Sequence, residues 1–231
     1  MIVVIPAYNE AENLPRVLEG VRAAVPDAEV VVVDDGSRDD TPRVAAQHGA
    51  RVLRHPFNLG YGAALQTGYK YAMERGADVL VQIDADGQHD PGEILKLVAA
   101  LQRDECDLVI GSRFVEPSGY AMSRSRNLGR RVFQALGRLA GVNVTDPTSG
   151  FQAMNRKVLE LYCGDFFPPD YPDVDVLVTA SRAGIRIREL PVRMHESLRE
   201  STLHGGSRAF YYVYKMLLSL WAASRSTGVN R

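Results

Sequence analysis

Two aspartates and a glutamine stand close together in the run Asp84-Ala85-Asp86-Gly87-Gln88, which directly follows the apolar stretch 79–83. Carboxylate and amide oxygens are the hard ligands that Mg²⁺ and Mn²⁺ prefer. A divalent ion bound here would bridge a diphosphate and neutralise the charge on a leaving nucleotide. On these residues alone, a turn whose acids cap the helix starting near Pro91 is the alternative. The position after a strand favours the metal site, with Asp84, Asp86 and Gln88 as its ligands.

Two further polar clusters also follow apolar runs. Asp34-Asp35-Gly36-Ser37 comes after 30–33, and Asp35 could accept a hydrogen bond from a base or a ribose hydroxyl. A turn with a helix N-cap explains this cluster equally well. Pro6-Ala7-Tyr8-Asn9-Glu10 comes after 2–5 and offers an aromatic surface and a carboxylate to a base. The run 58–62 is rich in glycine but lacks the Lys-Ser/Thr of a P-loop, so it is a weak motif.

Short β-branched runs alternate with amphipathic segments through the first half of the chain, which predicts an α/β fold with a doubly wound, mostly parallel sheet. The expected strands are 2–5, 30–33, 51–53, 79–83 and 107–111, and the expected helices are 12–24, 41–48, 62–75 and 91–102. Ligands of such sheets bind beyond the carboxyl ends of the strands. All three polar clusters fall at those ends.

The second half has a looser pattern. We expect a basic helix over 122–140, a loop over 146–150 and a helix over 156–162. After a proline-rich connector we expect a helix over 175–183, a strand over 185–192 broken at Pro191, a polar loop and a last helix over 207–223.

Composition narrows the class of protein. The chain has 231 residues, 45% of them hydrophobic, and a net charge of −1, which argues against a general nucleic-acid binder. Two cysteines are too few for a disulfide framework or a thiolate zinc site. The start of the chain does not resemble a signal peptide, and no apolar stretch reaches the length that spans a bilayer. Residues 122–157 and 186–231 are basic, which fits either solvated helix faces or an anionic partner.

Six motifs occur in one order along nearly the whole chain: Pro-Ala-Tyr-Asn-Glu, Asp-Asp-Gly-Ser, Asn-x-Gly-x-Gly, Asp-Ala-Asp-Gly-Gln, Gly-Ser-Arg at 111–113, and Asp-Pro-Thr-Ser-Gly-Phe at 146–151. Together they resemble the family-2 glycosyltransferases with the GT-A (Rossmann-like) fold. They are most similar to the dolichyl- or polyprenyl-phosphate sugar synthases that transfer mannose, glucose or N-acetylglucosamine. The resemblance implies an inverting transfer from a UDP- or GDP-linked sugar to a polyprenyl phosphate, assisted by Mg²⁺ or Mn²⁺.

The resemblance also implies roles for single residues. The nucleotide-sugar would contact Pro6, Ala7, Tyr8, Glu10, Asp35, Asp84, Ala85 and Asp86. Arg113 is similar to a phosphate-binding arginine, and Arg126 falls where an arginine for the acceptor phosphate is expected, so Asp86, Arg113 and Arg126 are the predicted catalytic residues. Arg130 stands where the family often has serine and would also face the acceptor phosphate. The loop 194–208 matches the family pattern only at its end, which leaves open whether Arg199, Arg208 or neither closes over the donor.

The acceptor decides whether a general base is needed. A phosphate monoester is already ionised near neutral pH, so positioning and electrostatic stabilisation would suffice. A sugar or small-molecule hydroxyl would require a carboxylate base, for which Asp146, Asp173 and Asp175 are candidates. For Asp173 and Asp175, helix capping is the plainer interpretation. A non-catalytic nucleotide-sugar-binding or scaffold protein is less consistent with the complete metal triad.

The expected domain organisation is one GT-A catalytic domain, 1–206, followed by an amphipathic helix and tail, 207–231. Within the domain, 1–113 would bind the nucleotide-sugar and 114–206 the acceptor. The last helix is apolar nearly all round and has basic flanks, so it either packs in the protein or lies at a membrane interface. The latter would make the protein cytoplasmic and peripheral on the inner face of the membrane, alone or with a separate membrane protein.

Overall fold

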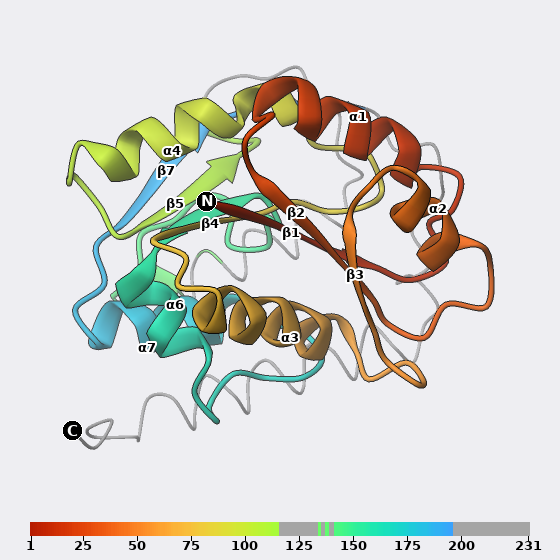
Figure 1. The fold of residues 1–231 in the computed structure, drawn as a ribbon. Coiled ribbons are helices and arrows are strands. Elements are labelled where there is room, and N and C mark those ends of the chain that lie inside the picture. The colour runs from red at the N-terminus through yellow and green to blue at the C-terminus, as the bar shows by residue number, and fades with distance from the viewer. Residues whose placement is uncertain (116–133, 135–136, 139–140, 196–231) are drawn as a thin grey trace, which may run out of the picture.

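The computed structural model describes residues 1–115, 134, 137–138 and 141–195. Its centre is a seven-stranded sheet in the order β3-β2-β1-β4-β6-β5-β7 (Figure 1). The strands are β1 (Ile2–Ala7), β2 (Glu29–Asp34), β3 (Arg51–Arg54), β4 (Val79–Gln82), β5 (Leu108–Ser112), β6 (Gln152–Asn155) and β7 (Ile187–Pro191). The helices are α1 (Leu14–Ala24), α2 (Thr41–Gln47), α3 (Tyr61–Glu74), the 3₁₀ helix η1 (Pro91–Glu93), α4 (Ile94–Gln102), α6 (Arg156–Tyr162) and α7 (Val174–Arg182).

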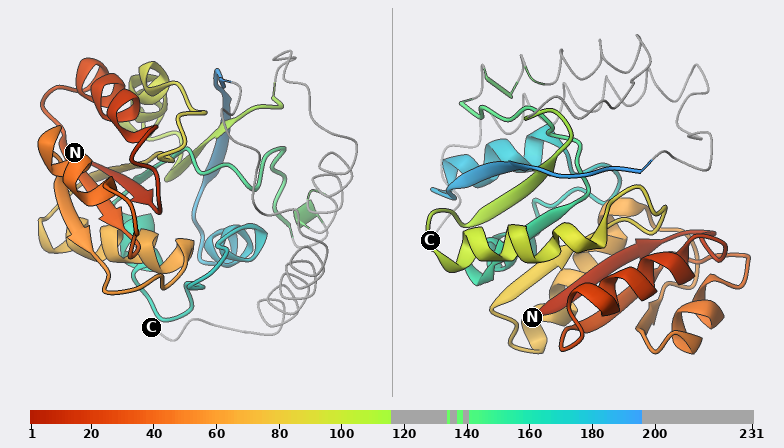
Figure 2. Two further views of the ribbon diagram at one scale, coloured as in Figure 1. Left: turned by 90° about the vertical axis from the view of Figure 1, so that its right-hand side faces the viewer. Right: turned by 90° about the horizontal axis from the view of Figure 1, so that it is seen from above.

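Helices cover both faces of the sheet, as Figure 2 shows from two sides. Alternate residues of a strand point to opposite faces, so β1 contributes Val3 and Ile5 to one core and Val4 to the other. The first core packs against α1, α2 and α4, and the second packs against α3, α6 and α7. Burial on both faces explains why the central strands are continuous apolar runs rather than alternating ones.

The expected mostly parallel sheet is confirmed. β1 pairs in parallel with β2 and β4, β2 with β3, and β5 with β7. The exception is β6, which lies antiparallel between β4 and β5 and was not predicted. Its four residues directly precede α6 and carry two amides, so neither length nor apolar pattern marks them as a strand.

The other differences from the sequence prediction are at element ends. The helix expected over 91–102 begins with a 3₁₀ turn, η1, before α4. The strand expected over 185–192 is shorter, and Pro191 ends it instead of breaking it. Among the described residues, no helix is long and apolar enough to cross a membrane. The expected helices over 122–140 and 207–223 fall mostly or wholly outside the described residues.

Candidate functional site

The loops after β1 and β2 are tied together at the carboxyl edge of the parallel strands. Asp35 donates its backbone N–H to Ala7 O at 2.9 Å, and Asn9 donates its backbone N–H to Ser37 Oγ at 2.9 Å. Asn9 has a φ of 56°, in the left-handed region where asparagine is among the tolerated residues. The structure therefore brings the first two predicted clusters into one surface.

Four predicted donor-site residues lie in this surface. Pro6 and Ala7 are the last residues of β1, and both are buried. Tyr8 follows them with 42% of its surface exposed, so its ring is accessible from solvent. Glu10 accepts a hydrogen bond from Asn13 Nδ2 at 2.8 Å, which orients its carboxylate at the start of α1.

Asp35 is buried and already bound within the protein. Its carboxylate accepts hydrogen bonds from the backbone N–H groups of Leu59, at 2.8 Å, and Gly60, at 2.9 Å. His55 Nδ1 lies 2.7 Å from Asp35 Oδ1, and His55 Nε2 lies 2.9 Å from Thr67 Oγ1. Asp35 therefore fixes the glycine-rich loop that precedes α3. Its contact with a base or ribose stays a prediction.

Each carboxylate oxygen of Asp84 has a hydrogen-bonding partner within the protein. Tyr61 donates its hydroxyl to Asp84 Oδ1 at 2.8 Å, and His89 Nε2 lies 3.3 Å from Asp84 Oδ2. A Cβ on Gly150 would come within 2.2 Å of Asp84 Oδ2, so only glycine lets this loop approach so closely. Burial raises the pKa of Asp84, but the hydrogen bond and charge of His89 and the hydrogen bond of Tyr61 outweigh it. The pKa of Asp84 therefore lies below its ordinary value.

Asp86 has a different environment. Burial first, and then the negative charge of Asp84, raise the pKa of Asp86. Gln88 donates its backbone N–H to Asp86 Oδ1 at 2.9 Å and its side-chain Nε2 to Asp86 Oδ2 at 2.7 Å. Among the described residues, no lysine or arginine forms an ion pair with Asp86.

These residues fit a divalent cation that is held jointly with a substrate diphosphate. No group of three or more His, Cys, Asp or Glu side chains in the described part of the chain could hold a metal alone. Mg²⁺ sites of this kind use one or two carboxylates and complete their coordination with phosphates and water. Asp84 and Asp86 would supply the two carboxylates, and a cation would relieve the repulsion between their charges. Gln88 braces Asp86 in this structure, and its role as a direct ligand stays a prediction.

Arg113, at the end of β5, is locked to Asp146. Arg113 donates from Nε to Asp146 Oδ2 at 2.7 Å and from Nη2 to Asp146 Oδ1 at 2.6 Å. Glu189 on β7 holds the same loop, because its carboxylate accepts the backbone N–H groups of Thr145, at 2.6 Å, and Asp146, at 2.8 Å. Asp146 is completely buried, so its carboxylate orients the arginine and has no access to an acceptor hydroxyl.

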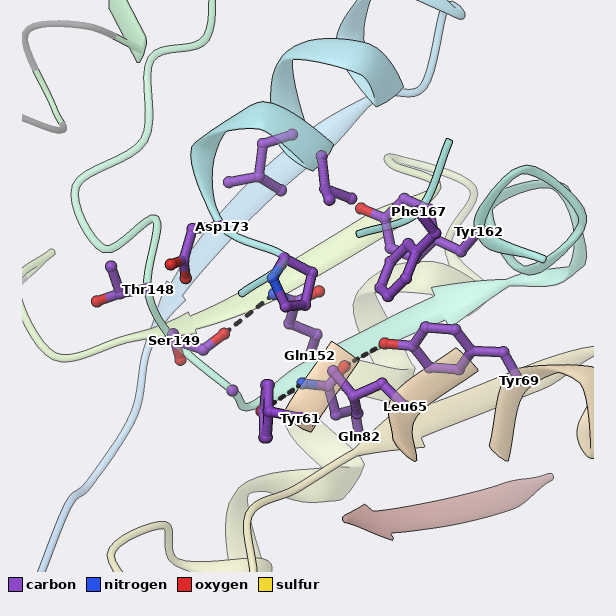
Figure 3. A pocket seen from close by; sticks show the side chains of 14 residues that line it. Tyr61, Leu65, Tyr69, Gln82, Thr148, Ser149, Gln152, Tyr162, Phe167 and Asp173 are labelled. Carbon is purple, nitrogen blue, oxygen red and sulfur yellow. Dashed lines mark hydrogen bonds between the residues drawn. The ribbon is translucent and has the colours of Figure 1, made fainter. Parts of the chain in front are cut away.

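A pocket open to solvent (Figure 3) is lined by Tyr61 and Gly150, two residues that also lie against Asp84. Tyr61 and Gln82 line one side of it, and Ser149, Gln152 and Asp173 line the other. The structure thus places the start of α3, the end of β4, the 148–150 loop and the segment before α7 around one space. Asp175 is buried, and its Oδ1 accepts the Asp173 backbone N–H at 3.2 Å, as expected of a residue in the first turn of a helix.

Several predicted residues lie outside the described part of the chain. They are Arg126, Arg130, Arg199 and Arg208. Their roles stay predictions.

Sequence reasoning missed His55, Tyr61 and His89. Each lies at the carboxyl edge of the sheet, directly after β3, at the start of α3 or after the Asp84–Gln88 run. Position at that edge was the available signal. The histidines of the sequence do not have the spacing typical of metal ligands, so no local pattern marks them as site residues.

Comparison with known proteins gives the family. The family model described as glycosyl transferase family 2 matches residues 2–162. An undecaprenyl-phosphate mannosyltransferase of Micrococcus luteus is 37% identical over 89% of this chain and 88% of its own length. A polyprenol monophosphomannose synthase of Mycolicibacterium smegmatis is 34% identical over 84% of this chain and 77% of its own length.

Solved structures show the same fold. The glucosyl-3-phosphoglycerate synthase of Mycobacterium tuberculosis, crystallised with phosphoglyceric acid, has a TM-score of 0.76 and 25% identity, covering 99% of this chain and 81% of that one. A second structure of that enzyme, with a TM-score of 0.73 and 26% identity over 99% of this chain and 80% of that one, contains Mn²⁺, UDP-glucose and phosphoglyceric acid. The motifs, the GT-A-like fold and these similarities agree, and the chain belongs to glycosyl transferase family 2.

Proposed function

We propose that this glycosyltransferase moves a hexose from a UDP- or GDP-linked sugar to a polyprenyl phosphate, with inversion and with the help of Mg²⁺ or Mn²⁺. The observation that carries the proposal is the Asp84–Asp86 carboxylate pair at the carboxyl edge, where no lysine or arginine of the described residues forms an ion pair with Asp86. The names of the relatives, a mannosyltransferase and a mannose synthase that use polyprenyl carriers, support the acceptor class.

At the donor end, the exposed ring of Tyr8 and the carboxylate of Glu10 would contact the base, beside Pro6 and Ala7. Asp35, which is buried, would contact the base or the ribose. Ala85, between Asp84 and Asp86 in the sequence, has a small side chain that would let the diphosphate approach the backbone. A divalent ion bound at Asp84 and Asp86 would supply Lewis-acid stabilisation of the leaving nucleoside diphosphate.

The acceptor end needs cations more than a base. An ionised phosphate is itself the nucleophile, so the chain must orient it and offset its charge. Arg113 is held in one orientation by Asp146, and Arg126 and Arg130 would add positive charge for the acceptor phosphate. Asp146 faces Arg113 and is fully buried, which supports an acceptor that does not depend on this carboxylate as a base.

A transferase that acts on a saccharide or small-molecule hydroxyl is the second candidate. One observation favours it: Asp173 lines the same pocket as Tyr61 and Gly150, where a base would be needed. Asp173→Asn separates the two, because loss of a general base costs about 10²–10⁴-fold in rate. For a phosphate acceptor we expect Asp173→Asn to lower kcat less than about tenfold.

The experiment that tests the proposal is a transfer assay with radiolabelled GDP-mannose, UDP-glucose and UDP-N-acetylglucosamine. Each donor is incubated with undecaprenyl phosphate or with a mixture of soluble saccharides, in Mn²⁺, in Mg²⁺ or in excess chelator. We expect label in the lipid phase with at least one donor, and none in chelator. If label passes only to soluble sugars, the hydroxyl acceptor is correct, and if no acceptor is labelled, both candidates fail.

We also propose the domain division 1–113, 114–206 and 207–231, with the last segment holding the enzyme on the inner face of the membrane or against a membrane protein. Its aromatic and basic composition supports the interface, since each basic residue near anionic lipid contributes about 1 kcal/mol. Co-sedimentation with anionic liposomes at low salt, for the full chain and a form ending at 206, tests it. A full chain that stays in the supernatant contradicts it.

A further inference from the structure

Tyr61 is the first residue of α3 and belongs to none of the roles assigned above. Successive residues four apart on a helix share a face, so Tyr61, Leu65 and Tyr69 all point toward the end of β4. Gln82 is the last residue of β4, and Asp84 follows two positions later, beyond the end of the strand. These positions bring the hydroxyls of Tyr61 and Tyr69 and the amide of Gln82 together (Figure 3), and Asp84 lies within hydrogen-bond distance of Tyr61.

These groups form one directional chain of hydrogen bonds. Tyr69 donates its hydroxyl to Gln82 Oε1. Gln82 Nε2 donates to the Tyr61 hydroxyl oxygen at 3.1 Å, and Tyr61 donates its own proton to Asp84 Oδ1 at 2.8 Å. Because the amide of Gln82 donates to Tyr61, the Tyr61 proton is directed to the carboxylate.

Tyr69 and Gln82, at the end of the hydrogen-bond series away from Asp84, are held by the surrounding core. Tyr69 is 1% exposed and packs against Tyr162 and Phe167, with ring centroids 5.9 and 5.5 Å away. Gln82 is 2% exposed within the sheet. The nearer end meets a carboxylate whose other oxygen is 3.3 Å from His89 and whose far side is closed by Gly150. The Asp84 carboxylate thus has one orientation fixed before any ligand arrives.

We propose that Tyr61, anchored through Gln82 and Tyr69, is a positioning residue that presets the Asp84 carboxylate for the divalent cation. This inference rests on the proposed function, since it assumes that Asp84 and Asp86 hold the metal. Partners that orient ligand carboxylates typically change metal affinity by 10–100-fold when they are removed. Within the part of the chain that the structure describes, the Asp86 carboxylate accepts hydrogen bonds from the backbone N–H and the side chain of Gln88, a residue of its own loop. Because the series of hydrogen bonds that ends at Asp84 is longer, we expect the Asp84 carboxylate to keep its orientation and the Asp86 carboxylate to adjust when the metal binds.

The test measures Mn²⁺ affinity directly, by the electron paramagnetic resonance signal of free Mn²⁺ in the presence of GDP and, separately, of UDP. We expect Tyr61→Phe to raise the Kd for Mn²⁺ about tenfold, with the melting temperature kept. Gln82→Met should raise it less, because the Tyr61 hydroxyl remains and loses only its anchor.

Tyr71→Phe is the matched control. Tyr71 lies on the same helix, and its hydroxyl also donates to a carboxylate, Glu29 Oε1, at 2.5 Å. Glu29 begins β2, at the opposite edge of the sheet from Asp84. Tyr71→Phe should leave the Mn²⁺ affinity within twofold of wild type.

The outcomes are distinct. A Tyr61→Phe protein that binds Mn²⁺ as tightly as wild type overturns the positioning role while the proposed function stands. Equal losses in Tyr61→Phe and Tyr71→Phe also overturn it, because they indicate a general effect on α3. A wild-type protein that binds no Mn²⁺ with either nucleotide overturns the metal-assisted function and this inference together.

Discussion

The two edges of the sheet place an aspartate in opposite electrostatic environments. At the amino edge, Asp107 precedes β5 and meets Arg186 through Nη2 at 3.0 Å and Nε at 3.1 Å, with Asn155 Nδ2 at 3.0 Å. At the carboxyl edge, the negative charge of Asp84 acts on Asp86, and no lysine or arginine of the described residues forms an ion pair with Asp86.

The pKa directions express this difference. The Arg186 hydrogen bonds hold the pKa of Asp107 far below its usual range, whereas burial and the charge of Asp84 raise the pKa of Asp86. A carboxylate whose charge is offset by the protein stabilises the fold. A carboxylate whose charge is left without an offsetting cation costs stability and is suited to bind an external one.

The largest effect should come from Asp86→Asn, which keeps the size of the side chain and removes its charge. We expect transfer to fall about a thousandfold or more, since metal stabilisation of a leaving group is worth several kcal/mol. The matched substitution Asp107→Asn should leave kcat within about twofold. Steady-state assays of both variants in saturating Mn²⁺ measure this contrast, and comparable losses in the two would erase it.

The free energy of unfolding should respond in the opposite way, with Asp107→Asn more destabilising than Asp86→Asn. Asp107→Asn removes a carboxylate that accepts the backbone N–H of Arg186 at 2.9 Å as well as side-chain donors. Charge-assisted hydrogen bonds are each worth about 1.5–3 kcal/mol, so we expect a loss of about 2 kcal/mol in the free energy of unfolding. Urea unfolding measures it, and a variant as stable as wild type would show that the Asp107 cluster is dispensable.

Acidification should separate the two edges. The folded-state pKa of Asp107 is depressed, so its contribution is complete above the ordinary aspartate pKa of about 3.9 and is lost as pH falls below it. Asp86 must be ionised to hold a cation, and its raised pKa means that it protonates at a higher pH. At subsaturating Mn²⁺, kcat/KM should therefore decline on acidification before the melting temperature does. Coincident declines would argue against the assignment.

The smallest expected effect is a gain in the stability of the metal-free protein on Asp86→Asn. Asp86→Asn removes the repulsion between Asp84 and Asp86, so the metal-free variant should be as stable as wild type or more stable by up to about 1 kcal/mol. Thermal unfolding in chelator measures the change. A clear destabilisation would mean that the Asp86 carboxylate has a structural role like that of Asp107.

The sequence predicted the sheet well where one physical rule dominated. Apolar runs such as 30–33 are buried on both faces, and the polar clusters after them could be assigned to the carboxyl edge. The sequence did not predict β6, because this strand forms through its pairing with β4 and β5 and has no strand pattern of its own. The C-terminal segment was predicted as a helix but lies outside the described residues.

Within the site, the residue types were predictable and their partners were not. Asp84 and Asp86 could be assigned from their spacing, because two carboxylates this close together after an apolar strand offer hard oxygen ligands to one divalent ion. The bond between Asp146 and Arg113 joins residues 33 positions apart, and no local pattern encodes it. Asp35 was assigned to the donor, yet its oxygens also hold the backbone of Leu59 and Gly60, a use that only the fold reveals.

The central claim is that the carboxylate pair at the carboxyl edge binds a nucleoside diphosphate through a divalent ion. Isothermal titration calorimetry of GDP and of UDP, in Mn²⁺ and in chelator, tests it for wild type, Asp86→Asn and Asp107→Asn. The account predicts that one nucleotide binds wild type and Asp107→Asn alike in Mn²⁺, and at least about tenfold more weakly in chelator or to Asp86→Asn. Equal affinity with and without Mn²⁺ in the wild type, or undiminished Mn²⁺-dependent binding by Asp86→Asn, would contradict it.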